Sequence, residues 1–157
     1  MSPMTLANQP SHETTRNRML GAVLCAEHRR LLAVFGDMMC RAEAGDFRLC
    51  DEAWDSFAAD LEKHFGFEEA ELFPRFADSG DDARAEVAHL SAEHRAIRRR
   101  LFELGVGLQT RTVRHDDIEA LLADLGRHAE REDAVLYPWA SATYGTRPPV
   151  CELVEDG

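Results

Sequence analysis

The sequence DLEKHFGFEEAELFP spans residues 60–74, and the same pattern returns as DLGRHAEREDAVLYP in residues 124–138. The second copy lies 64 residues after the first, as the step from His64 to His128 shows. Each copy places a histidine four residues before a glutamate. On a helix, side chains with this spacing lie on one face, roughly 5–6 Å apart at Cβ. The repeat therefore indicates two helices that each direct one imidazole and one carboxylate toward a common point, as a metal site requires.

A shorter repeat lies upstream of each copy. Residues 26–31 read AEHRRL and residues 92–97 read AEHRAI, so that His28 recurs as His94 after 66 residues. The chain thus has two related halves, and each half supplies two histidines and one glutamate. These six side chains are the candidate metal ligands: His28, His64, Glu68, His94, His128 and Glu132.

Hydrophobic periodicity predicts an all-α fold. Apolar residues recur at steps of three and four, and no segment alternates with period two as a strand would. Long amphipathic helices with short connections are typical of an antiparallel up-and-down four-helix bundle, here with a dinuclear metal site in its core. Asp51 is the expected N-cap of the second helix. The expected helices cover about residues 13–44, 51–77, 82–109 and 116–140.

One domain accounts for the length of 157 residues. We expect the bundle to occupy residues 13–140. Residues 1–12 are expected to form a flexible N-terminal arm. Residues 141–157 are expected to form a C-terminal tail, because its Gly and Pro residues cannot extend the last helix.

Composition limits the partners and the location. Eighteen Lys and Arg against 29 Asp and Glu give a net charge of −11, which argues against a nucleic-acid partner. No apolar stretch approaches the roughly 20 residues that cross a bilayer. The first residues lack the pattern of a secretory signal. The four cysteines form no C-x2-C pair. We therefore expect a soluble, cytoplasmic protein with reduced thiols and no membrane association.

The candidate ligands fall within stripes of Leu, Ile, Val, Phe and Met. A buried carboxylate costs several kcal/mol unless it is paired or bound to a metal, so Glu68 and Glu132 need compensation. Hydrogen-bonded core histidines would be the alternative, but four of them with two carboxylates would require an elaborate proton network. Three histidines repeat at neither offset and are expected at the surface or at helix ends: His12, His89 and His115.

Several residues beside the candidate ligands also repeat. Glu69 and Asp133 follow the two glutamates and are interpreted as surface acids rather than as alternative ligands. Asp60 and Asp124 lie four residues before His64 and His128, and either could accept the second N–H of a ligating imidazole. The nearby aromatic residues are expected to pack in the bundle: Phe65, Phe73, Tyr137 and Trp139.

The donor types favour iron or manganese. Imidazole suits several transition metals, whereas carboxylates shared between two metals suit Fe or Mn better than a closed tetrahedral zinc site. If two carboxylates bridge two metals and each metal also binds two histidines, each metal has four protein ligands. An octahedral ion then keeps one or two positions for a bridging oxygen and a small external ligand. A mostly apolar surrounding suits O2, NO or peroxide better than a large polar substrate.

The chain resembles the hemerythrin-like (HHE cation-binding) domain family of bacterial type. The resemblance rests on the two His-x3-Glu elements, each followed by an acidic residue and Leu-(Phe/Tyr)-Pro, and on the two Glu-His-Arg elements. It covers about residues 13–140. Oxygen-carrying members have a further His four residues from the third-helix histidine, whereas here Leu90 and Arg98 hold those positions.

The resemblance implies a four-helix bundle that holds two non-haem irons with an oxo or hydroxo bridge. His28 and His64 would bind one iron, and the histidines of the second half would bind the other. Glu68 and Glu132 would bridge the two irons.

The leading functional hypothesis is a di-iron protein that binds or senses O2, NO or peroxide. One alternative is an enzyme-like role in NO or peroxide reduction, which would need an external reductant, or in the repair of iron–sulfur centres. Another alternative is metal storage. The sequence alone leaves these alternatives, and any catalytic turnover, open.

Overall fold

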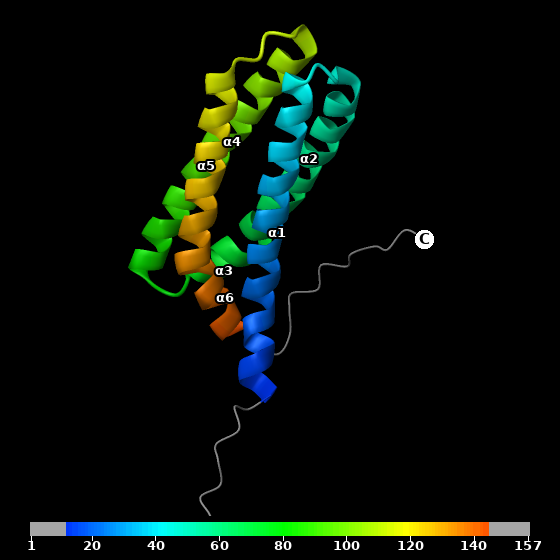
Figure 1. Ribbon diagram of the computed structural model, residues 1–157. Coiled ribbons are helices and arrows are strands. Elements are labelled where there is room, and N and C mark those ends of the chain that lie inside the picture. Colours follow the sequence, from blue (N-terminus) through cyan, green and yellow to red (C-terminus); the bar gives the residue numbers. More distant parts are fainter. Residues whose placement is uncertain (1–11, 145–157) are drawn as a thin grey trace, which may run out of the picture.

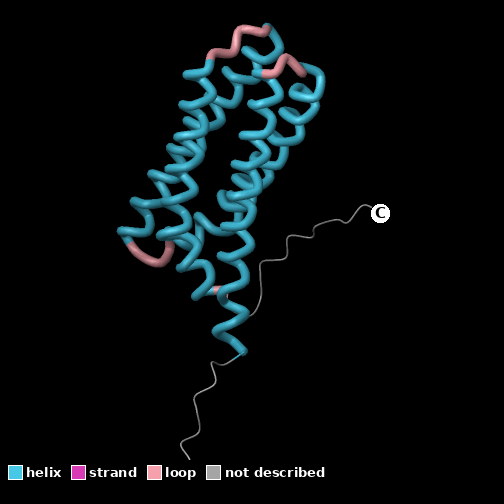
Figure 2. The backbone as a smooth tube through the Cα atoms, viewed as in Figure 1, coloured by secondary structure: helices cyan, strands magenta, loops and turns pink. Residues whose placement is uncertain are grey.

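The computed structural model describes residues 12–144, which form four long helical rods in an up-and-down arrangement (Figure 1). Within this range the helices are joined by short loops and no strand occurs (Figure 2). Each rod contacts the next along the chain, and the first also contacts the last. The predicted all-α, antiparallel four-helix bundle is thereby confirmed. In chain order the elements are α1 (His12–Glu43), α2 (Phe47–Phe67), η1 (Glu68–Leu72), α3 (Phe73–Ala77), α4 (Asp81–Thr110), α5 (His115–Arg131), η2 (Glu132–Leu136) and α6 (Tyr137–Thr143). The first rod is α1, the second is α2 with η1 and α3, the third is α4, and the fourth is α5 with η2 and α6.

The turn between the first two rods differs from its prediction. Gly45 has a positive φ of 83°, which glycine adopts at no steric cost. The chain therefore re-enters a helix at Phe47, directly after Asp46. The prediction that Asp51 caps this helix is wrong, because Asp51 lies inside α2 and forms an ion pair with Arg111 at 3.0 Å.

Two π-helical turns, η1 and η2, interrupt the second and fourth rods, and each begins at the glutamate of a His-x3-Glu element. Each precedes a proline, Pro74 or Pro138, which has no N–H to donate and whose ring crowds the carbonyl four residues back. The N–H of the residue before each proline instead bonds five residues back. Phe73 bonds to the Glu68 carbonyl and Tyr137 to the Glu132 carbonyl. The wider turn shifts the buried face, so Leu136 is buried where regular periodicity predicts Val135, which is 40% exposed.

Apolar side chains form two core clusters, one on each side of a polar layer. The larger cluster includes Phe35, Phe57 and Leu121. The smaller includes Leu72 and Leu136, beside the π turns. The buried polar residues lie between these clusters along the rods, so the helices hold them in a water-poor layer.

The predicted arm and tail fall largely outside the described residues. Of the arm only His12 is described, as the first residue of α1, and of the tail only residues 141–144 are described. The last helix extends to Thr143, three residues beyond its predicted end.

Candidate metal centre

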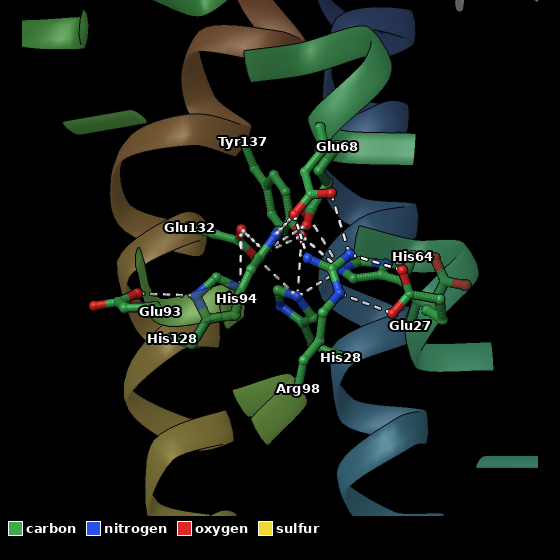
Figure 3. A network of polar contacts seen from close by, with 12 residues as sticks. Glu27, His28, His64, Glu68, Glu93, His94, Arg98, His128, Glu132 and Tyr137 are labelled. Carbon is green, nitrogen blue, oxygen red and sulfur yellow. Dashed lines mark hydrogen bonds and ion pairs between the residues drawn. The ribbon is translucent and has the colours of Figure 1, made fainter. Parts of the chain in front are cut away.

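The structure brings all six predicted ligands together in the polar layer (Figure 3). None is more than 6% exposed, and both glutamates are fully buried. α1 and α4 contribute one histidine each, whereas α2 with η1 and α5 with η2 contribute a histidine and a glutamate each. In contrast, the side chains of His89 and His115 are exposed, as expected. The side chain of His12 lies outside the described part of the chain.

The ligand atoms form two overlapping groups, each with its donor atoms within 4.8 Å of one another. Both groups contain the two glutamates, and each has its own pair of histidines. We name them by these pairs: the 28/64 group consists of His28, His64, Glu68 and Glu132, and the 94/128 group consists of His94, His128, Glu68 and Glu132.

Each glutamate directs one oxygen to each group. Glu68 places Oε1 3.3 Å from His64 Nε2 and Oε2 3.5 Å from His94 Nε2. Glu132 places Oε2 3.2 Å from His28 Nε2 and Oε1 3.1 Å from His128 Nε2. This is the arrangement that two carboxylates need to bridge a pair of cations.

Four outer carboxylates face the Nδ1 atoms of the four histidines. Glu27 lies 3.2 Å from His64 Nδ1 and Glu93 lies 2.9 Å from His128 Nδ1. The other two outer carboxylates directly follow the buried glutamates in the sequence. Glu69 lies 2.8 Å from His94 Nδ1, and Asp133 lies 3.4 Å from His28 Nδ1, beyond good hydrogen-bond length.

These contacts correct two interpretations from the sequence. Glu69 is not merely a surface acid, because it accepts a hydrogen bond from His94, whereas Asp133 is exposed, as predicted. Asp60 and Asp124 do not support the histidines. Asp60 pairs with Arg30, and Asp124 pairs with Arg100 and Arg127. A signal was available, because the four outer carboxylates are adjacent in sequence to candidate ligands and recur at the same offsets of 66 and 64 residues: Glu27 with Glu93, and Glu69 with Asp133.

Arg98 lies four residues after His94 on the same helix, α4. Its guanidinium donates to Glu69 at 2.7 Å and to Glu62 at 2.8 Å. Glu69 is thereby held against His94, and the hydrogen bond from Arg98 lowers the pKa of Glu69. The arginine thus supports a predicted ligand, His94, from outside the polar layer.

The inner nitrogen atoms fit a bound cation. At His64, His94 and His128 a carboxylate accepts a hydrogen bond from Nδ1, so the neutral imidazole turns its Nε2 lone pair inward. The Nε2 atoms of His28 and His64 are only 2.9 Å apart, and those of His94 and His128 are 3.0 Å apart. Two lone pairs at such distances repel unless a cation lies between them. Two inner carboxylate oxygens, Glu68 Oε2 and Glu132 Oε1, are also buried without a hydrogen-bond partner, as is the outer nitrogen atom Nδ1 of His28.

Without a metal, protons bound to the histidines supply part of the positive charge that cations would provide. Burial lowers the pKa of His64, but hydrogen bonds to Glu27 and Glu68 outweigh it and raise that pKa to about 10. Burial also lowers the pKa of His94, but hydrogen bonds to Glu132 and Glu68 outweigh this effect and raise that pKa to about 9. Burial would raise the pKa of Glu132, but hydrogen bonds from three histidines hold it well below its usual value. The layer therefore attracts positive charge strongly.

Tyr137 is a member of the centre that the sequence interpretation assigned to packing. Its hydroxyl donates to Glu68 Oε1 at 2.5 Å and lies 3.0 Å from His28 Nε2 (Figure 3). Burial and the charges of the two glutamates raise its pKa far above the usual value, so the metal-free group is a phenol. Phe73 holds the matching place in the first half, and the predicted packing of Phe73 and Phe65 is confirmed by stacking on His94.

A small hollow reaches the centre from the side of α1, α2 and α5. Its volume is about 20 Å³, enough for one water-sized molecule. Its lining combines one imidazole from each histidine pair with apolar side chains, namely His28, His128, Leu31, Leu32, Leu61, Phe65, Leu125 and Ala129.

An up-and-down bundle with two four-donor groups that share two buried carboxylates defines a helical cation-binding protein. The sequence matches the model of the hemerythrin HHE cation binding domain over residues 20–140, and the chain belongs to that family. No curated protein and no solved structure gave a significant match. None of the helices in residues 12–144 combines the length and apolar character that crossing a membrane requires.

Proposed function

We propose that this protein holds two non-haem irons and binds a small ligand, O2, NO or peroxide, at the pair. One observation carries the proposal: each buried glutamate offers one oxygen to each histidine pair. A single-metal site would leave one pair of facing imidazoles and two carboxylate oxygens without a cation. Two cations satisfy every inner donor atom.

The donor chemistry supports iron. Two imidazole nitrogens and two carboxylate oxygens make a mixed set that suits iron, whereas structural zinc prefers a closed tetrahedron rich in thiolate and imidazole. No cysteine belongs to either group of potential ligands among the described residues. Iron so held supplies redox chemistry and affinity for diatomic ligands.

The surroundings support a small ligand. The hollow beside His28 and His128 holds about one water-sized molecule and is otherwise apolar. The side chains around it offer nothing that would orient a large polar substrate. Three outer carboxylates hydrogen-bond to Nδ1 of His64, His94 and His128. They fix these rings and keep their Nε2 atoms turned inward, so that the ring positions are set before a ligand arrives.

The test is reconstitution with ferrous iron without oxygen, followed by metal analysis and optical titration with O2, NO and peroxide. We expect about two irons per chain, matching the two donor groups, and a spectral change with at least one ligand. His89→Ala, at an exposed histidine on the same helix as His94, should leave both results unchanged. One iron per chain would contradict the dinuclear site, and a spectrum insensitive to all three ligands would contradict ligand binding.

A further inference from the structure

The hydroxyl oxygen of Tyr137 lies close to every donor atom of the 28/64 group. It is 2.5 Å from Glu68 Oε1 and 3.2 Å from Glu132 Oε2. It is 3.0 Å from His28 Nε2 and 3.2 Å from His64 Nε2. An ordinary buried phenol needs one or two hydrogen-bond partners, whereas this oxygen faces four atoms that could each bind a metal.

The spacing of these atoms is that of ligands around one ion. Metal bonds to nitrogen and oxygen are about 2.0–2.2 Å long, so two donors at a right angle lie about 3 Å apart. Around the group, His28 Nε2 is 2.9 Å from His64 Nε2 and 3.2 Å from Glu132 Oε2. His64 Nε2 is 3.3 Å from Glu68 Oε1. The phenol oxygen caps these four atoms at similar distances, as the fifth corner of an octahedron would.

The π turn η2 is what delivers this oxygen. In a regular α-helix, residues five apart differ by about 140° around the axis, so Tyr137 would point away from Glu132. The wider turn returns the tyrosine to the face of the glutamate. Such single π turns are frequent at functional sites.

We propose that the phenolate oxygen of Tyr137 is a fifth protein ligand of the ion held by the 28/64 group. The inference rests on the proposed function, since it needs a metal there. On binding, the phenolic O–H bond breaks, the proton leaves to solvent, and an oxygen lone pair forms the bond to the ion.

The two metal positions are therefore unequal. The Tyr137 ring lies 5.3 Å from the His28 ring at 32°, and the Phe73 ring lies 5.2 Å from the His94 ring at 29°. The two aromatic rings are placed alike and differ by one hydroxyl. Phe73 offers no donor atom, so the ion of the 94/128 group keeps the vacant position, and the external ligand binds there.

The test uses the full chain loaded with ferric iron, because phenolate bound to ferric iron gives a visible charge-transfer band and phenolate ring modes in resonance Raman spectra. We expect both signals in the wild type and their loss in Tyr137→Phe. The chain has two tyrosines, so Tyr144→Phe is the matched control and should keep both. The Tyr144 hydroxyl contacts Arg75, outside the metal layer.

The outcomes separate the two proposals. A wild type that binds two irons but shows no phenolate modes overturns the tyrosine ligand and leaves the iron pair standing. A wild type that takes up no iron pair overturns the proposed function first. If Tyr137→Phe fails to fold, the wild type and Tyr144→Phe still decide, because modes present in both can arise only from Tyr137.

A mirror variant tests the inequality of the two ions. Phe73→Tyr places a hydroxyl at the matching point of the 94/128 group. We expect azide, used as the probe, to bind the ferric pair of this variant at least tenfold more weakly than that of the wild type. Equal azide affinity would overturn the assignment of the vacant position.

Discussion

At the scale of single residues, the centre depends on the difference between buried and exposed carboxylates. Glu132 is fully buried and meets one histidine of each pair through separate oxygens. Glu130, two residues earlier on the same rod, is exposed. The two glutamates differ little in sequence context, and only their direction relative to the polar layer separates their functions.

Glu132→Ala should therefore abolish binding of the metal pair. The substitution removes one of the two bridges and leaves both ions with one donor fewer. Metal analysis after reconstitution should show one iron per chain or none, whereas Glu130→Ala should retain the wild-type content. Equal iron content in the two variants would mean that Glu132 is not a ligand.

Glu27 acts on the metal only through His64, whose Nδ1 it contacts at 3.2 Å. Removing such an outer partner typically weakens metal affinity roughly 10–100-fold, because the ring loses its fixed direction and part of its basicity. We expect a loss of this size in Glu27→Ala, measured by competition with a chelator. The exposed Glu52→Ala is the control. An unchanged affinity would show that packing alone holds the His64 ring.

At the scale of elements, the sequence predicts most of the site because helical periodicity is regular up to the glutamates. His64 and Glu68 lie one turn apart, as do His128 and Glu132, and the spacing places all four correctly. Beyond that point the prolines widen the helix, and periodicity no longer predicts which residues face inward. For this reason Tyr137 and the exposure of Val135 escaped prediction. The outer carboxylates escaped because each reaches a histidine of another rod.

Pro138→Ala tests the link between proline and the π turn. Alanine restores an N–H and removes the clash with the carbonyl four residues back, so the rod should relax toward a regular α-helix. His128 and Glu132 keep their spacing, so the iron content should persist. Tyr137 should rotate away, and the phenolate signals should weaken by more than half. Unchanged signals would mean that the packing of Tyr137, rather than the proline, maintains the wide turn.

At the scale of the whole molecule, the polar layer divides the core and couples stability to the metal. Six ionisable side chains lie between two apolar clusters, and burying their charged forms costs several kcal/mol each unless a metal or bound protons compensate. A ligand that binds only the folded state stabilises it by about 2.7 kcal/mol at one hundred times its dissociation constant. The iron-loaded protein should therefore melt at a much higher temperature than the metal-free protein. The stability of the metal-free protein should depend on protonation of its buried histidines instead.

The stability of the metal-free protein should fall as the pH rises. In the folded metal-free protein the pKa of His64 is raised to about 10 and that of His94 to about 9, against an ordinary 6.5. Their contribution to stability is fully present below pH 6.5 and is lost as the pH rises through the folded values. Each unit of difference between folded and unfolded pKa corresponds to about 1.36 kcal/mol. The melting temperature of the metal-free protein should thus fall steadily between pH 6.5 and 10.

The iron-loaded protein should follow the opposite trend at the acid end of this range. Its ligating imidazoles carry no proton at Nε2, so protons compete with iron, and metal affinity weakens as the pH falls. The gap between the two melting temperatures should therefore widen from pH 6.5 toward pH 9. Thermal melts followed by circular dichroism, with and without iron, measure this gap directly. A gap that stays constant or narrows would mean that the four histidines do not exchange protons for metal, and both the ligand set and the origin of the stability would need another explanation.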